Sequence, residues 1–104
     1  MIYSYDPAKS DKNALERGIS FEMVRDFDFE TAKFWQDDRK NYPEPRYIAL
    51  GYLNERLHVL VFAEIEGGIR VISFREANNR EGKKHGFPQT LDRCLLYTSP
   101  SPRD

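Results

Sequence analysis

Arginine side chains are the groups in this sequence best suited to chemistry on a phosphate. The planar guanidinium keeps its charge and makes two-point contacts with phosphate oxygens. Several arginines stand with a tyrosine and a glutamate on, or just behind, expected strands. These candidate site residues are Arg46, Tyr47, Arg70, Arg75, Arg80 and Glu81. Strand alternation puts Arg70 and Arg75 on opposite faces, so we do not expect these two to converge.

Each candidate also has a purely structural interpretation. An arginine is equally a solvated surface charge, Tyr47 a half-buried sheet residue, and Glu81 a helix surface acid or the ion-pair partner of a nearby arginine. The stretch 69–86 holds five basic residues against two acidic ones. Such a cluster either grips phosphates or simply faces solvent.

Other catalytic patterns are missing from the sequence. It has no glycine-rich phosphate loop, no HExxH motif and no serine nucleophile elbow. The histidines, His58 and His85, are too few for a typical histidine metal site, and Cys94 is the single cysteine. We therefore expect no metal and no cofactor. His58 is expected to be a surface residue of a strand.

Composition limits the classes of protein further. The 104 residues suffice for one domain, and 16 basic against 17 acidic side chains give a net charge of -1. This balance argues against a general polyanion-coating protein. No apolar run reaches the roughly 20 residues of a transmembrane helix, and the first residues do not resemble a signal peptide. We expect a cytoplasmic protein without a membrane partner.

The first half of the sequence predicts helices. Asp6-Pro7 is a good helix entry, and Gly18 a good ending, for a helix over 7–17. Ser20 offers a second cap, for a short helix over residues 21–27. Residues 28–45 are mixed, and residues 37–40 and 43–45 predict a loop between strands. The pair Phe34-Trp35 in this polar stretch is either a core anchor or a partner-binding site.

The second half of the sequence alternates with a period of two. Strands are predicted over 47–52, 57–65 and 69–74, separated by hairpin-length turns, and a weaker last helix over 77–85. Consecutive hairpins form an antiparallel meander. We therefore predict an α+β fold, with N-terminal helices packed on one face of the sheet and a short C-terminal helix.

Residues 94–104 break with the rest of the sequence. They are rich in serine and proline, and they match one translated reading frame of a transposase-type sequencing adapter. We interpret residues 1–93 as one domain and 94–104 as a non-native tail, the alternative being an ordinary flexible tail. Deleting the tail should change stability by no more than roughly 0.5 kcal/mol.

Several ordered motifs, taken together, resemble the BrnT family of bacterial toxins. They are Asp6-Pro7-Ala8-Lys9, Ser20-Phe21-Glu22, the stretches 46–51 and 59–62, and the signature over residues 69–81. The resemblance covers roughly residues 3–85. It implies a RelE-like fold, a ribonuclease toxin of a type II toxin–antitoxin pair, and a single BrnT-like domain.

The resemblance also implies a mechanism and partners. Cleavage would need no metal, since the RNA's own 2′-hydroxyl attacks while basic side chains stabilise the developing charge. A BrnA-like antitoxin would neutralise the toxin. The DNA-binding end of that antitoxin would repress the operon, so the toxin would reach operator DNA only indirectly. Two alternatives remain open: a non-catalytic subunit that binds an antitoxin and acts as co-repressor, and an orphan domain inactivated by its altered C-terminal end.

Overall fold

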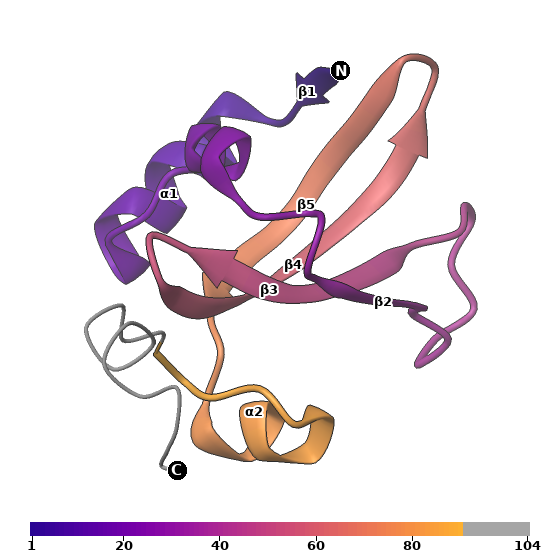
Figure 1. Cartoon of the computed structure of the whole chain (residues 1–104). Coiled ribbons are helices and arrows are strands. Elements are labelled where there is room, and N and C mark those ends of the chain that lie inside the picture. The colour runs from indigo at the N-terminus through magenta and orange to yellow at the C-terminus, as the bar shows by residue number, and fades with distance from the viewer. Residues whose placement is uncertain (91–104) are drawn as a thin grey trace, which may run out of the picture.

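A five-stranded sheet organises the chain in the computed structural model, which describes residues 1–90 (Figure 1). The elements in order are β1 (Ile2–Ser4), α1 (Pro7–Arg17), the 3₁₀ helix η1 (Phe21–Asp26), β2 (Lys33–Gln36), β3 (Tyr47–Leu53), β4 (Arg56–Ile65), β5 (Gly68–Glu76) and α2 (Asn79–His85). The predicted α+β class is confirmed, while the RelE-like relationship stays a prediction. Both the domain boundary at residue 93 and the tail 94–104 lie outside the described residues.

The sheet is mixed, with strand order β1-β5-β4-β3-β2. Strands β2 to β5 form the predicted antiparallel meander. The sequence did not predict β2, which holds Phe34 and Trp35 and pairs with β3. The N-terminal strand β1 adds to the other edge and runs parallel to β5, with Tyr3 opposite Ile69.

Helix α1 begins and ends as its sequence predicts. Asp6 accepts a hydrogen bond at Oδ1 from the backbone N–H of Ala8, 2.9 Å away. Pro7 opens the first turn, where a backbone N–H would have no partner within the helix. Gly18 ends the helix with φ 78°, a left-handed conformation that favours glycine, and its N–H donates to the carbonyl of Ala14.

Polar side chains attach α1 to the rest of the fold. Buried Asn13 donates from Nδ2 to the carbonyls of Ile19 and Phe74, each 2.8 Å away. Ser10 Oγ accepts from the backbone N–H of Phe21 and so joins α1 to η1. Ser20 is the N-cap residue of the second helix, as predicted, but its hydroxyl makes no cap hydrogen bond and the segment is a 3₁₀ helix.

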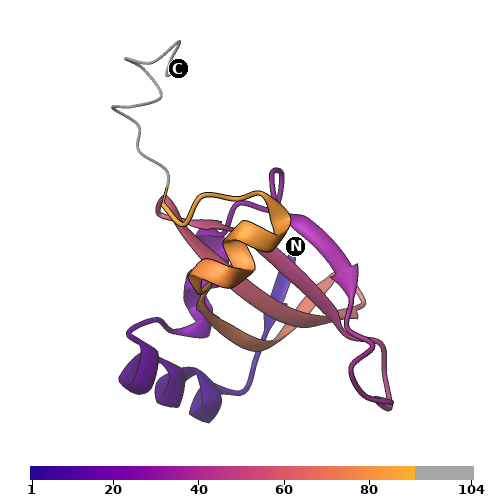
Figure 2. The same cartoon turned by 90° about the horizontal axis from the view of Figure 1, so that it is seen from below.

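Hydrophobic side chains bury both faces of the sheet. The first core lies under α1 and η1, and includes Val24, Leu60 and Phe74. The second core lies on the opposite face, includes Leu57 and Val59, and extends to Ala77 and Phe87, which flank α2. Figure 2 shows α2 crossing in front of the strands, away from α1. The N-terminal helices therefore pack on one face, whereas α2 covers part of the other.

Burial on both faces also corrects the expectation for His58. It was expected on the surface, but it is only 3% exposed and lies against Phe74, with ring centroids 5.4 Å apart. Its Nδ1 hydrogen-bonds with the carbonyl oxygen of Arg56 at 2.7 Å, and burial lowers its pKa. His58 is a residue of the first core.

A β-bulge in β5 changes which side chains share a face. Val61 lies opposite Ser73, whereas the next residue of β4, Phe62, lies opposite Val71, so Ile72 is an extra residue in β5. Arg70 faces the same side as Arg75, because their partners Ala63 and Val59 are four residues apart on β4. The prediction that Arg70 and Arg75 lie on opposite faces is wrong for this reason.

Helix α2 sits close to the sheet because of a glycine. Asn78 caps it in a reciprocal capping box with Glu81, so the helix begins two residues later than predicted. Gly82 is buried, and a Cβ there would lie 2.8 Å from the carbonyl oxygen of Phe87 and 3.2 Å from Leu57 Cδ2. The chain then returns to the sheet, where Tyr52 Oη donates to the carbonyl of Pro88 at 2.7 Å.

Candidate active site

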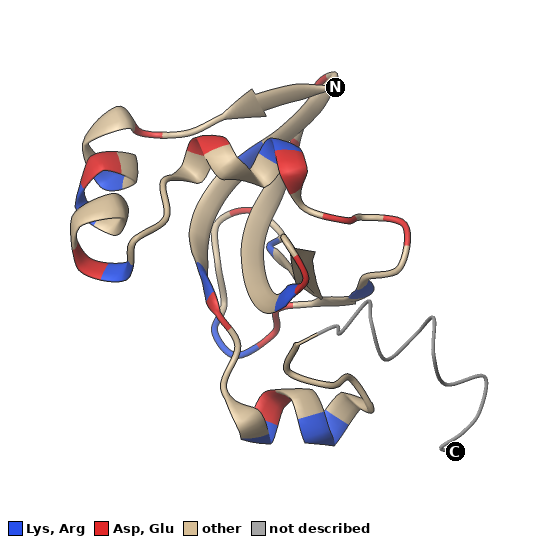
Figure 3. Ribbon diagram, turned by 60° about the vertical axis from the view of Figure 1, so that its left-hand side comes forward, with Lys and Arg blue, Asp and Glu red and all other residues tan. Residues whose placement is uncertain are grey.

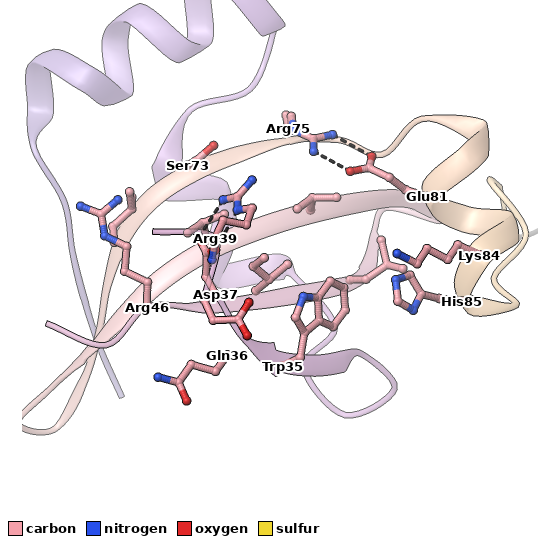
Figure 4. A pocket seen from close by; sticks show the side chains of 16 residues that line it. Trp35, Gln36, Asp37, Arg39, Arg46, Ser73, Arg75, Glu81, Lys84 and His85 are labelled. Atoms are coloured by element: carbon pink, nitrogen blue, oxygen red, sulfur yellow. Dashed lines mark hydrogen bonds and ion pairs between the residues drawn. The ribbon is translucent and has the colours of Figure 1, made fainter. Parts of the chain in front are cut away.

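A cavity of about 470 Å³ opens on the second face of the sheet, between the β2–β3 loop and α2 (Figure 4). Apolar side chains of the three central strands form its floor, including Leu50, Val59 and Ile72. Charged side chains from the loop, β5 and α2 surround that floor. An apolar base with a few convergent charged groups is the usual form of a ligand-binding site.

Arg75 and Glu81 form a two-point ion pair beside α2. Arg75 Nη1 and Nη2 donate to Glu81 Oε1 and Oε2 over 2.8 and 2.6 Å. Both side chains are about one-third exposed. The hydrogen bonds from Arg75 hold the pKa of Glu81 below its ordinary value although burial opposes this, and they raise the pKa of Arg75. Glu81 therefore stays ionised and orients the guanidinium.

A second two-point pair lies in the β2–β3 loop. Arg39 donates from Nε and Nη2 to the two carboxylate oxygens of Asp37, at 2.7 Å each. The side chain of Asp37 is fully buried, whereas that of Arg39 is 65% exposed. Hydrogen bonding by Arg39 lowers the pKa of Asp37, against the effect of burial. The buried carboxylate thus holds an exposed guanidinium at the cavity.

Arg46 has no carboxylate partner within residues 1–90. Its guanidinium carbon lies 4.2 Å from the centroid of the Tyr42 ring, which is cation–π distance. Its buried Nε has no hydrogen-bond partner among the described residues. A buried N–H without an acceptor is unfavourable, so this guanidinium is suited to an anionic ligand.

An aromatic stack lies at the opposite end of the cavity from Arg46 (Figure 4). Trp35 from β2 and His85 from the last turn of α2 stack with their ring centroids 4.7 Å apart and their planes at 22°. Desolvation lowers the pKa of His85, and the positive charges of Lys33 and Lys84 lower it further. These effects favour the neutral form of the imidazole.

The cavity gathers three of the six residues that the sequence singled out, namely Arg46, Arg75 and Glu81. Arg70 shares the face but pairs with Glu44 away from the cavity. Arg80 is exposed on α2, next to Lys83. Tyr47 packs on the opposite face of the sheet, its ring 5.8 Å from that of Phe62.

The other polar residues of the cavity were not predicted as site residues. The sequence predicts a loop at Asp37 and Arg39, whose nearby opposite charges are the signal that could have identified them. Trp35 is an aromatic residue in a polar stretch of the sequence. It contacts the second core and also stacks on His85, so it serves as an anchor and lines the cavity at once.

Charge on the remaining surface is mixed. Figure 3 shows acidic and basic positions interspersed over α1, η1 and the strands, whereas α2 is mostly basic. Four cationic side chains line the cavity: Arg39, Arg46, Arg75 and Lys84. Since two of them are held by carboxylates, the site combines fixed guanidiniums with two unpaired cations, Arg46 and Lys84, within the described part of the chain.

The sequence of the chain matches a known protein family over most of its length. The matching family is described as the ribonuclease toxin, BrnT, of a type II toxin–antitoxin system, and the match spans residues 5–81. The chain belongs to the BrnT family. No curated protein matches it individually.

The region that matches the BrnT family includes both ion pairs of the cavity, and it ends before the last turn of α2. Arg46, Arg75 and Glu81 fall within residues 5–81, whereas Lys84 and His85 follow the matched region. The BrnT family consists of ribonuclease toxins of type II toxin–antitoxin systems. Membership therefore implies RNA as the target and an antitoxin as the partner.

Residues 1–90 of this BrnT family member offer neither a metal-binding cluster nor a membrane-spanning helix. No cluster of three or more His, Cys, Asp and Glu side chains capable of holding a metal ion occurs there. Nor is any helix in that range long and apolar enough to cross a bilayer.

Proposed function

We propose that this chain is an RNA endonuclease that cleaves without a metal ion, using the cavity beneath α2. The observation that carries the proposal is the convergence of Arg39, Arg46 and Arg75 on one cavity with an apolar floor. Guanidiniums match phosphate oxygens in geometry and charge, and they stabilise the extra negative charge of a phosphorane. Membership of the ribonuclease toxin family supports the same activity.

The roles of the cavity residues follow from their partners. Arg46, whose Nε has no acceptor, would take a phosphate oxygen. Arg75, oriented by Glu81, would contact the phosphate that is cleaved. The nucleophile would be the 2′-hydroxyl of the RNA, so the protein has to position groups and move protons rather than activate water. Arg70, Arg80 and Tyr47 lie outside the cavity; the two arginines would contact RNA beyond the cleaved bond.

The antitoxin would be BrnA-like, and it would act by covering this cavity. A partner of that kind would carry the DNA-binding end that represses the operon, so the chain itself would reach operator DNA only indirectly. We place the pair in the bacterial cytoplasm, where RNA is translated. The mostly basic α2 beside the cavity supports an acidic contact surface on the antitoxin.

One observation favours a second candidate function. Two of the cavity guanidiniums, on Arg39 and Arg75, are already bound by carboxylates. If RNA cannot displace those carboxylates, the chain is a non-catalytic subunit that binds its antitoxin and assists repression.

Induced expression separates these functions. We expect growth arrest and cut transcripts when the chain is expressed alone, relief when a BrnA-like neighbour is co-expressed, and cleavage by the purified chain in the presence of EDTA. Binding of the antitoxin with intact transcripts would support the co-repressor instead. Cleavage abolished by EDTA and restored by a divalent cation would contradict metal independence.

A further inference from the structure

The imidazole of His85 is held in a fixed orientation at one end of the cavity. Its ring stacks on Trp35 with centroids 4.7 Å apart, and Trp35 is itself packed against the second core. His85 belongs to the last turn of α2, whose next residue, Gly86, ends the helix with its N–H bonded to the carbonyls of Gly82 and Lys83. Both the ring plane and the backbone of His85 are therefore defined before any ligand arrives.

Two of the three carboxylates that line the cavity, those of Glu81 and Asp37 but not that of Asp38, are bound by arginines. Both oxygens of Glu81 bind Arg75, and Oε1 also accepts from the backbone N–H of Asn78. Both oxygens of Asp37 bind Arg39. Hydrogen bonds of this kind hold the pKa of each acid below its ordinary value, which makes it a weak base.

The charges that face His85 favour its neutral form. Lys33 on β2 and Lys84 on α2 lower its pKa below the ordinary 6.5, after the larger effect of desolvation, and only Glu81 acts in the opposite direction. The other histidine cannot take this part, because His58 is buried on the opposite face against Phe74. A neutral imidazole with a free ring nitrogen accepts a proton at physiological pH.

We infer that His85 is the general base of this active site, and that it takes the proton of the attacking 2′-hydroxyl of RNA. The 2′-oxygen then forms a bond to phosphorus, and the bond from phosphorus to the 5′-oxygen breaks. The leaving 5′-oxygen keeps the electron pair and takes a proton from water. The products are a 2′,3′-cyclic phosphate and a 5′-hydroxyl, and the imidazolium returns its proton to solvent. This inference rests on the proposed ribonuclease function.

The test is the pH dependence of cleavage of a translated messenger RNA, assayed with and without ribosomes. For the unaltered chain we expect the rate to rise with pH through an apparent pKa below 6.5 and then to level off, because only the neutral imidazole is active. His85→Gln should lower the rate by about 10²- to 10⁴-fold, the usual contribution of a general base, and should remove the rise. Thermal unfolding of His85→Gln establishes that the variant is folded.

A second variant tests the role of His85 without altering it. Lys33 does not line the cavity, and its charge lowers the pKa of His85. Lys33→Gln should therefore move the rise in rate to higher pH. The matched control is Lys9→Gln, which removes the same charge from exposed α1 on the other side of the sheet and should leave the profile in place.

The outcomes distinguish the role of His85 from the ribonuclease function itself. Cleavage by His85→Gln at the rate and with the pH profile of the unaltered chain would overturn the role of His85 while leaving the ribonuclease function intact. A Lys33→Gln profile that coincides with that of Lys9→Gln would also count against His85. An unaltered chain that binds antitoxin but cleaves no RNA under any condition would overturn the proposed function, and the role of His85 with it.

Discussion

Asn13 on α1 and Phe74 on β5 are joined by a hydrogen bond of 2.8 Å from the Asn13 side-chain amide to the Phe74 carbonyl. The second hydrogen of the same amide binds the carbonyl of Ile19, at the turn that leads to η1. α1 buries Ser10 and Asn13 rather than large apolar side chains. Its attachment to the sheet therefore depends on these polar contacts.

Asn13→Ala should lower the free energy of unfolding by about 2–3 kcal/mol, because it removes two buried hydrogen bonds to the carbonyls of Ile19 and Phe74. Urea denaturation monitored by circular dichroism measures the change. The control is Asn41→Ala in the exposed loop, which should stay within roughly 0.5 kcal/mol of the unaltered chain. Equal midpoints for the two variants would contradict the role of Asn13 as the bridge.

Glu81→Gln should destabilise the chain at pH 7 and flatten its stability at acid pH. The pKa of Glu81 is lower in the folded chain than its ordinary value of 4.5, so its ion pair stabilises fully above that value. The stabilisation is lost as pH falls through the folded pKa. We expect a loss of about 1–2 kcal/mol at pH 7, from the pair with Arg75 and the helix cap.

Urea midpoints measured from pH 7 down to pH 3 test this expectation. The difference between the unaltered chain and Glu81→Gln should be constant near neutrality and shrink below pH 4.5. Glu66→Gln, at an exposed turn, is the control and should show no comparable loss at pH 7. A difference that does not change with pH would mean that the charge of Glu81 contributes nothing.

Gly82→Ala tests how closely α2 approaches the sheet. Alanine is favoured over glycine inside a helix by about 1 kcal/mol. Here the added Cβ would meet the Phe87 carbonyl oxygen at 2.8 Å, so the packing cost should win by about 1–2 kcal/mol. Thermal unfolding measures the sign. Lys83→Ala, at the next and exposed position of the helix, should be neutral or slightly stabilising.

Replacing single arginines by alanine should rank the surface by its contribution to toxicity. Arg46→Ala and Arg75→Ala should restore growth most strongly, since both side chains line the cavity. Arg70→Ala and Arg80→Ala, outside it, should act more weakly, and the quadruple variant should be inactive. Growth after induction, with transcript profiling and soluble protein level as controls, measures the ranking. Full toxicity of the quadruple variant would remove the assignment of the site.

Local chemistry was enough to predict much of this fold. The Asp6 cap, Pro7 and Gly18 set the bounds of α1, and alternation of apolar residues revealed β3, β4 and β5. β2 was missed because it depends on pairing with β3, and its residues Lys33 and Gln36 give it no apolar alternation. The parallel pairing of β1 with β5 brings the N-terminal strand to the far edge of the meander, a long-range contact that no local pattern encodes.

The site was predictable only in part, because its geometry also depends on contacts between segments far apart in the sequence. Residue type identified Arg46 and Arg75 as phosphate-binding candidates, and Glu81 as an arginine partner. Their convergence depends on the pairing of Arg75 with Val59 and on α2 folding back over the second face. The stack of Trp35 on His85 joins residues 50 positions apart, a relationship that neither residue signals on its own.

The extra residue in β5 also decides whether its two arginines share a side of the sheet. If β5 kept all nine residues but lost the bulge, strict alternation would turn Arg70 and Arg75 to opposite sides, because they are five positions apart. Removing Ile72 would leave them four positions apart, so a one-codon deletion at the bulge would keep the basic surface on one side. Among relatives of this chain, a β5 that is one residue shorter between these arginines should therefore lack the bulge.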